Sequence, residues 1–110
     1  MKEIKIYVGL NDADLHTQKF ETPKYMKVLK SVCKNYGVGF SIEQINGGYF
    51  HEDGTYVEEN TLVLTLIDIP KETVKEIAKD LCIFFNQESV LITKDEIETF
   101  FFSERLDKNE

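Results

Sequence analysis

The chain has 110 residues, of which 42% are hydrophobic and 12% aromatic, a composition that can bury a core without disulfides or metals. Thirteen Lys and Arg residues against 20 Asp and Glu residues leave a net charge of -7. This charge argues against direct binding to nucleic acid, which depends on neutralising phosphates. The apolar runs are too short to cross a bilayer, and the first residues lead straight into a strand pattern. We therefore expect a cytoplasmic protein with no membrane segment.

No linker-like or repeated segment divides the sequence, so we expect a single domain over residues 1–105 and a flexible tail over residues 106–110. The two cysteines, Cys33 and Cys82, have neither the spacing of a zinc site nor that of a redox pair. Both fall on apolar helical faces, where a free cysteine is usually a small buried hydrophobe. The sequence predicts no metal and no other cofactor.

The first predicted element is a half-buried strand over residues 2–10, where apolar and polar residues alternate. A polar connection over residues 11–21 follows it. The first helix begins at Thr22-Pro23, because threonine is a favourable cap and proline fits the first turn. Gly37 is expected to end this helix.

Residues 38–43 alternate again and predict a second strand, and the third is expected over residues 56–69. Between them Asp53-Gly54 predicts a tight hairpin turn, because both residues tolerate left-handed backbone. A two-residue turn pairs odd-numbered with even-numbered positions, yet both strands carry their clearest apolar residues at even positions. We therefore expect a β-bulge, with Gly47-Gly48 as its site.

Pro70 begins the second predicted helix, and residues 88–93 predict a fourth strand. Residues 94–105 remain open, because residues 93–96 are typical of a helix capping box whereas residues 98–102 favour a short strand. We favour the strand. The order β-α-β-β-α-β predicts an α+β ferredoxin-like sandwich, an antiparallel sheet of order 4-1-3-2 with both helices on one face and a short C-terminal extension. The residues expected on that face are Ile4, Ile6, Val8, Phe40, Leu62, Leu64 and Leu66.

Several short runs resemble an uncharacterised bacterial family known only as a domain of unknown function. They are Tyr7-Val8-Gly9-Leu10, Gly48-Tyr49 before Asp53-Gly54, Glu58-Glu59 before the Leu62 and Leu64 strand, and Phe85-Asn86-Gln87-Glu88-Ser89-Val90-Leu91. The resemblance spans residues 6–93 and implies the same ferredoxin-like fold. Members of that family often carry a secretion signal, whereas we expect none here. The family brings no known activity, so the resemblance implies no catalytic residue.

No nucleophile–base pair, Walker loop or dinucleotide fingerprint occurs, so we assign no catalytic residue. The alternative is a small-molecule site or an enzyme with a polar site under the first loop, formed by Tyr7, His16, Gln87 and Glu88. This expectation places the ends of the first and third strands at one edge of the sheet. It places the hairpin, with His51 and Asp53, at the opposite end. His16 and His51 are then too far apart to share a metal.

The favoured interpretation is a small acidic interaction or regulatory module that binds a basic protein partner and self-associates. Acidic and aromatic side chains alternate along the predicted hairpin, which makes it the expected partner surface: Tyr49, Phe50, Glu52, Asp53, Tyr56, Glu58 and Glu59. We favour this module over an enzyme.

Self-association is expected through the side of the sheet that the two helices leave uncovered. Its predicted centre is apolar, formed by Tyr7, Val63 and Ile67, and its rim is polar. Two such faces packed about a two-fold axis would form a homodimer, and Val63→Glu would then give a monomer. The run Phe100-Phe101-Phe102 is the alternative cover for this face, and in that case the protein is a monomer.

Overall fold

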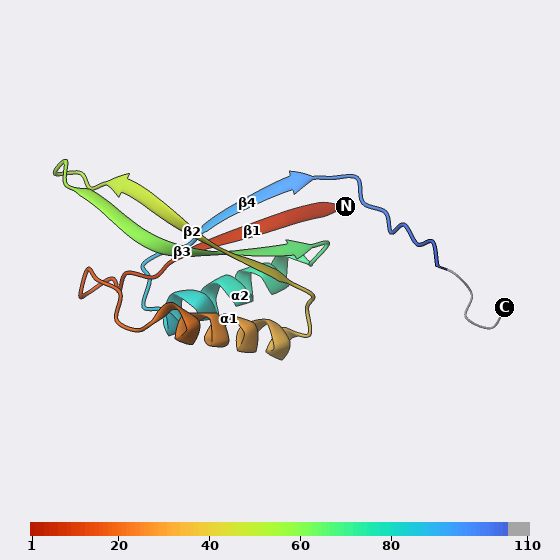
Figure 1. The fold of residues 1–110 in the computed structure, drawn as a ribbon, viewed down its shortest axis with the longest axis horizontal. Coiled ribbons are helices and arrows are strands. Elements are labelled where there is room, and N and C mark those ends of the chain that lie inside the picture. Colours follow the sequence, from red (N-terminus) through yellow and green to blue (C-terminus); the bar gives the residue numbers. More distant parts are fainter. Residues whose placement is uncertain (106–110) are drawn as a thin grey trace.

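The computed structural model describes residues 1–105, so the predicted flexible tail, residues 106–110, lies outside the described residues. Its elements are β1 (Lys2–Gly9), α1 (Thr22–Tyr36), β2 (Ser41–Phe50), β3 (Tyr56–Ile67), α2 (Lys71–Phe84) and β4 (Leu91–Glu96). The strands form one antiparallel sheet in the order β2-β3-β1-β4, and both helices cover the same face of it (Figure 1). The predicted ferredoxin-like fold and strand order are confirmed.

The core lies between the sheet and the helices, because alternate residues of the two central strands face α1 and α2. Six of the seven predicted core residues are almost completely buried: Ile4, Ile6, Val8, Leu62, Leu64 and Leu66. The helices contribute Leu29, Cys33, Ile77 and Leu81. Phe40 packs against this cluster but is only partly buried, because it lies just before β2 begins. Full burial of a Leu or Ile side chain is worth about 1.5–3 kcal/mol.

The β2–β3 hairpin has a three-residue loop in place of the predicted two-residue turn. The N–H of His51 donates to the carbonyl of Thr55 at 2.9 Å, and Gly54 adopts the left-handed φ of 87° that such a loop requires. A loop of this length pairs even with even positions, so the strands keep one register from Ser41 opposite Thr65 to Phe50 opposite Tyr56. The predicted β-bulge at Gly47-Gly48 is wrong, because the longer loop removes the mismatch that called for it.

The hairpin lies at the same end of the sheet as the C-terminal end of β1. Glu3 pairs with Ile67 and Gly9 with Thr61, so β1 and β3 run in opposite directions. The start of β3, and the hairpin loop before it, therefore lie beside the end of β1. The expectation that placed the ends of the first and third strands together, and the hairpin at the far end, is wrong.

Residues 97–105 have no regular secondary structure. Lys94 to Glu96 belong to β4, and the N–H of Ile97 still donates to the carbonyl of Met1 at 2.9 Å. Beyond that point β1 offers no residue to pair with, so neither the capping-box helix nor the favoured strand over residues 98–102 forms. Within residues 1–105 no helix is long and apolar enough to span a membrane.

Candidate functional site

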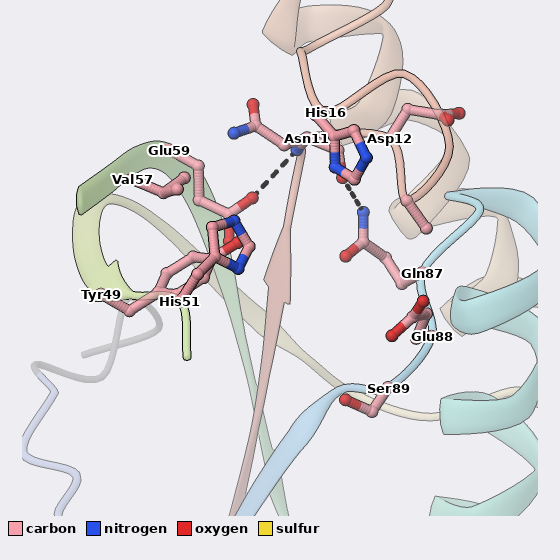
Figure 2. A pocket seen from close by; sticks show the side chains of 11 residues that line it. Asn11, Asp12, His16, Tyr49, His51, Val57, Glu59, Gln87, Glu88 and Ser89 are labelled. Carbon is pink, nitrogen blue, oxygen red and sulfur yellow. Dashed lines mark hydrogen bonds between the residues drawn. The ribbon is translucent and has the colours of Figure 1, made fainter. Parts of the chain in front are cut away.

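A cavity of about 550 Å³ opens where three connections meet at one end of the sheet (Figure 2). The segment after β1 lines it with Asn11, Asp12, Ala13 and His16. The β2–β3 hairpin lines it with Tyr49, His51, Val57 and Glu59. The connection from α2 to β4 completes it with Gln87, Glu88 and Ser89.

The hairpin forms a wall of the cavity because it continues past the end of β1. β1 stops at Gly9, opposite Thr61, whereas β3 begins five residues earlier, at Tyr56. Alternate residues of this overhang share one face, and those that line the cavity are odd-numbered. Tyr49 lies opposite Val57 in the ladder, and its ring meets that of His51 edge-on with 5.4 Å between centroids.

Glu59 folds back across the end of β1. Its Oε2 accepts a hydrogen bond from the N–H of Asn11 at 3.0 Å. A β-carbon at Gly9 would overlap the Glu59 carboxylate, so only glycine permits this approach. Gly9 thus holds a half-buried carboxylate at the edge of the cavity.

The backbone N–H and C=O of Asn11 connect two walls of the cavity. Its N–H is bound by Glu59 of the hairpin, and its carbonyl accepts a hydrogen bond from Gln87 Nε2 at 2.6 Å (Figure 2). One backbone segment therefore positions side chains from β3 and from the α2–β4 connection.

Asp12 organises the loop that carries His16. Its Oδ1 accepts hydrogen bonds from the backbone N–H groups of Asp14 and Leu15 at 2.9 and 3.0 Å, and from Asn86 Nδ2 at 3.0 Å. These bonds, that of Asn86 first, lower the pKa of Asp12 below its ordinary value because they favour the ionised form. Asp12 therefore remains an anion at neutral pH.

The lining of the cavity is negatively charged. Its lining contains three carboxylates, those of Asp12, Glu59 and Glu88, but no Lys or Arg. Burial, and then the charge of Glu59, raise the pKa of Tyr49, so its phenol stays neutral. Such a lining favours a cation or a neutral polar molecule over a polyanion. Among residues 1–105 no group of three or more His, Cys, Asp or Glu side chains is arranged to hold a metal ion.

The structure brings together three of the four residues proposed for a polar site, since His16, Gln87 and Glu88 all line the cavity. Tyr7 is not among the lining residues. It lies in β1 before Gly9, opposite Val63 and Leu91. His51, which was expected at the far end, lines the same cavity as His16 because β3 runs antiparallel to β1.

Sequence reasoning missed other lining residues of this cavity. Asn11 was not proposed for any site, and Glu59 and Tyr49 were assigned to the partner surface. The available signal was Gly9, because a glycine inside a strand pattern indicates that another group approaches the backbone closely.

The predicted partner surface divides in two. Tyr49 and Glu59 turn into the cavity, and Glu59 is only half-exposed. The remaining members are exposed: Phe50, Glu52, Asp53, Tyr56 and Glu58. The rings of Phe50 and Tyr56 lie 5.1 Å apart, so they form a compact aromatic patch at the tip of the hairpin.

The predicted dimer face offers less apolar surface than its sequence pattern indicates. Val63 is only 4% exposed in the single chain, Tyr7 is half-buried, and Ile67 is 38% exposed. Tyr7 and Glu43 flank Val63 directly on the neighbouring strands. Val63→Glu would therefore disturb the fold itself, and a homodimer through this face stays a prediction. The alternative cover is wrong for the described chain, since Phe100, Phe101 and Phe102 stand in solvent.

Comparisons with known proteins place this fold among solved structures. No protein-family model matches the chain, and no curated protein matches it. A phage SAM lyase in complex with S-methyl-5'-thioadenosine is similar, with 28% identity, a TM-score of 0.67, and coverage of 86% of this chain and 80% of that chain. A DUF3240 family protein from Shewanella baltica is 11% identical, with a TM-score of 0.52 and coverage of 94% and 97%. The complex of Bacillus subtilis GlnK with ATP is 16% identical, with a TM-score of 0.50 and coverage of 87% and 82%.

Proposed function

We propose that the cavity binds S-adenosylmethionine (SAM) and that the protein is a lyase that cleaves it to S-methyl-5'-thioadenosine. The observation that supports this most directly is the likeness to the phage SAM lyase, at 28% identity over 86% of this chain. That protein is described with S-methyl-5'-thioadenosine bound. The cavity described above supplies a site of suitable chemistry on the corresponding fold.

The charge of the lining supports a sulfonium substrate. SAM carries a positive sulfur, and Asp12, Glu59 and Glu88 supply negative charge around the cavity. The ring of Tyr49 offers an aromatic face to a cation or to the adenine base. ATP, by contrast, would bring several negative charges to a lining that has no Lys or Arg to receive them.

The proposed reaction follows from the difference between the two molecules. S-methyl-5'-thioadenosine keeps the adenosyl and methyl groups, so the bond that breaks joins sulfur to the γ-carbon of the amino-acid fragment. The bonding pair stays on sulfur, which changes from a sulfonium to a neutral thioether. The fragment completes its own valences, either by losing a β-proton to a carboxylate of the lining to form an alkene or by closing through its own carboxylate oxygen. No water is consumed, as the term lyase requires.

Ring closure requires little of the protein beyond orientation, and the elimination requires in addition a carboxylate of the lining as base. The sulfonium sulfur departs as a neutral thioether and needs no further activation. The cavity therefore has to hold the amino-acid fragment in the reactive conformation and keep water away. Asn11, Gln87 and Ser89 are the polar groups available to bind the nucleoside and the amino-acid end. The hydrogen bonds from Glu59 and Gln87 to Asn11 fix the positions of two of the walls.

Incubation of the purified protein with SAM tests the proposal directly. We expect S-methyl-5'-thioadenosine to accumulate above the rate of spontaneous decay, as followed by liquid chromatography and mass spectrometry. Calorimetry should show binding of S-methyl-5'-thioadenosine and much weaker binding of ATP. Failure of SAM to be cleaved, together with no binding of either SAM or the thioether, would contradict the proposal.

The exposed tip of the hairpin supports a second candidate, the acidic interaction module. Phe50 and Tyr56 form an exposed aromatic pair beside Glu52, Asp53 and Glu58, a composition suited to a basic protein partner. The test is capture of a partner from a bacterial lysate by the native protein and by Phe50→Ser. Capture that is lost both at high salt and in the variant supports the module. Equal capture by both proteins counts against it.

A further inference from the structure

The chain ends its described part in an arm that leaves three phenylalanines in solvent. Residues 97–102, the C-terminal arm, follow β4 and run away from the body of the domain (Figure 1). Phe100, Phe101 and Phe102 are 83%, 97% and 79% exposed. Adjacent apolar side chains as exposed as these are typical of an interface surface.

The strand that leads into the arm has an open edge. β4 is the last strand of the sheet, with β1 on one side and no strand on the other within residues 1–105. Its outer N–H and C=O groups are therefore available to another strand. Next to this edge Leu91 is 61% exposed and Ile92 is 40% exposed.

We propose that two copies of this chain associate by exchanging arms, each arm adding an antiparallel strand to the free edge of β4 of the other copy. Because the arm continues β4 directly, pairing of one arm places the second arm on the first copy by symmetry. The result is one continuous eight-stranded sheet with a two-fold axis perpendicular to it. The occupant of the open edge is thus a second copy.

The register of this pairing is restricted by geometry. Such a two-fold axis places the helices of both copies on the same side of the joint sheet. Two residues that lie opposite each other across the interface are therefore both even-numbered or both odd-numbered. With Glu96 on the axis, Phe100 lies opposite Ile92, Phe101 opposite Leu91, and Phe102 opposite Val90. Each phenylalanine therefore meets an apolar side chain on its own face of the sheet.

Charge supports the same register. It places Glu98 opposite Lys94, an acid against a base. Glu96 would face its own copy on the axis, where its charge is already compensated, because its Oε1 accepts a hydrogen bond from the Met1 ammonium group at 3.1 Å. The register with Ile97 on the axis places Glu98 opposite Glu96 and Phe100 opposite Lys94, so it loses both kinds of complementarity. The register with Asp95 on the axis keeps an acid-base pair, Glu96 opposite Lys94, but it places Phe101 opposite Ser89 and Glu98 opposite Ile92, so it retains less apolar pairing.

The phenylalanines also supply enough apolar surface for a stable interface. A buried phenylalanine removes about 150–250 Å² from solvent, so six of them from two copies remove on the order of 1,000 Å². Added to the backbone pairing, this reaches the lower bound of stable interfaces, about 1,200 Å² in total.

Light scattering of the full chain at micromolar concentration, combined with charge reversal, tests the proposal. The native protein should have twice the chain mass of 12.8 kDa. Lys94→Glu places Glu opposite Glu98 in both symmetric contacts, and Glu98→Lys places Lys opposite Lys94. Each variant alone should raise the dimer dissociation constant about tenfold or more. An equimolar mixture of the two variants restores both pairs, so it should regain dimer as the heterodimer.

Lys79→Glu serves as the matched control, because Lys79 is an exposed residue of α2 and belongs neither to β4 nor to the arm. It should leave the dimer intact. Phe101→Ser should weaken association without changing the circular dichroism of the folded domain. A native mass near 12.8 kDa, an assembly that both charge reversals leave unchanged, or a mixture that stays monomeric would overturn the proposal.

Discussion

The carboxylate of Glu59 lies directly over Gly9, in the space that a β-carbon at that position would occupy. This contact places a side chain of the hairpin over the end of β1. There the Glu59 carboxylate accepts a hydrogen bond from the N–H of Asn11. Asn11 in turn accepts a hydrogen bond from Gln87. A missing side chain in one strand therefore sets the position of three residues that line the cavity.

Gly9→Ala should displace the Glu59 carboxylate and weaken ligand binding while the fold survives. The added methyl group overlaps the carboxylate, which sits at the end of a flexible side chain and can move away at the cost of its bond to Asn11. We expect the affinity for S-methyl-5'-thioadenosine to fall about tenfold, by calorimetry, as for the loss of one positioned hydrogen bond. Gly39→Ala is the control, because a β-carbon there meets nothing within 4 Å. Equal affinities for the two variants would contradict this role of Gly9.

Glu59→Gln should separate the charge of Glu59 from its hydrogen bond. The amide oxygen can still accept the N–H of Asn11, but the negative charge beside the cavity is lost. We expect kcat/KM for SAM to fall at least about tenfold, since a cation loses an opposing charge in a partly buried site. Affinity for the neutral S-methyl-5'-thioadenosine should change less than about threefold. Glu72→Gln, at the exposed start of α2, should change neither quantity.

The loop that carries His16 should open in acid. Asp12 has a pKa below 3.8 because Asn86 and the N–H groups of Leu15 and Asp14 bind its ionised form. A lowered pKa in the folded state gives a stabilisation that is fully present above the ordinary value and is lost as pH falls through the lowered value. The protection factors of the Asp14 and Leu15 amides, taken relative to the intrinsic exchange rate at each pH, should therefore fall below about pH 4, before those in the β1–β3 ladder. Simultaneous loss of protection in loop and ladder would contradict a local opening.

Cys33 should be nearly inert to thiol reagents in the folded protein. Burial raises its pKa from 9.0 to about 11, which leaves about a hundredfold less thiolate at pH 8 than an ordinary cysteine has. The Cys82→Ser variant isolates this thiol, because these are the two cysteines of the chain. Absorbance with an aromatic disulfide reagent should show a slow reaction in buffer and a fast one in denaturant. A fast reaction in buffer would show that Cys33 is accessible.

The fold class could be predicted from the sequence, because the signals for it are local. The alternation of apolar and polar residues along β1 and β3 depends on a few neighbouring residues. The same is true of the helical spacing of apolar residues around Leu29 in α1 and around Ile77 in α2. The hydrophobic core between the sheet and the helices follows from those patterns. Gly37 likewise ended α1 as predicted, because its left-handed φ of 65° is set within one turn.

The assembly of the cavity depends on contacts between segments that are distant in the sequence. Whether His51 lies beside His16 depends on the direction of β3 relative to β1, and whether Glu59 faces inward depends on how far the hairpin continues beyond Gly9. The burial of Val63 similarly depends on Tyr7 and Glu43 on the neighbouring strands. Each of these contacts joins residues far apart in the chain. Local pattern fixes which residues alternate, but only strand pairing fixes which of them meet, because register and direction are set by contacts between strands.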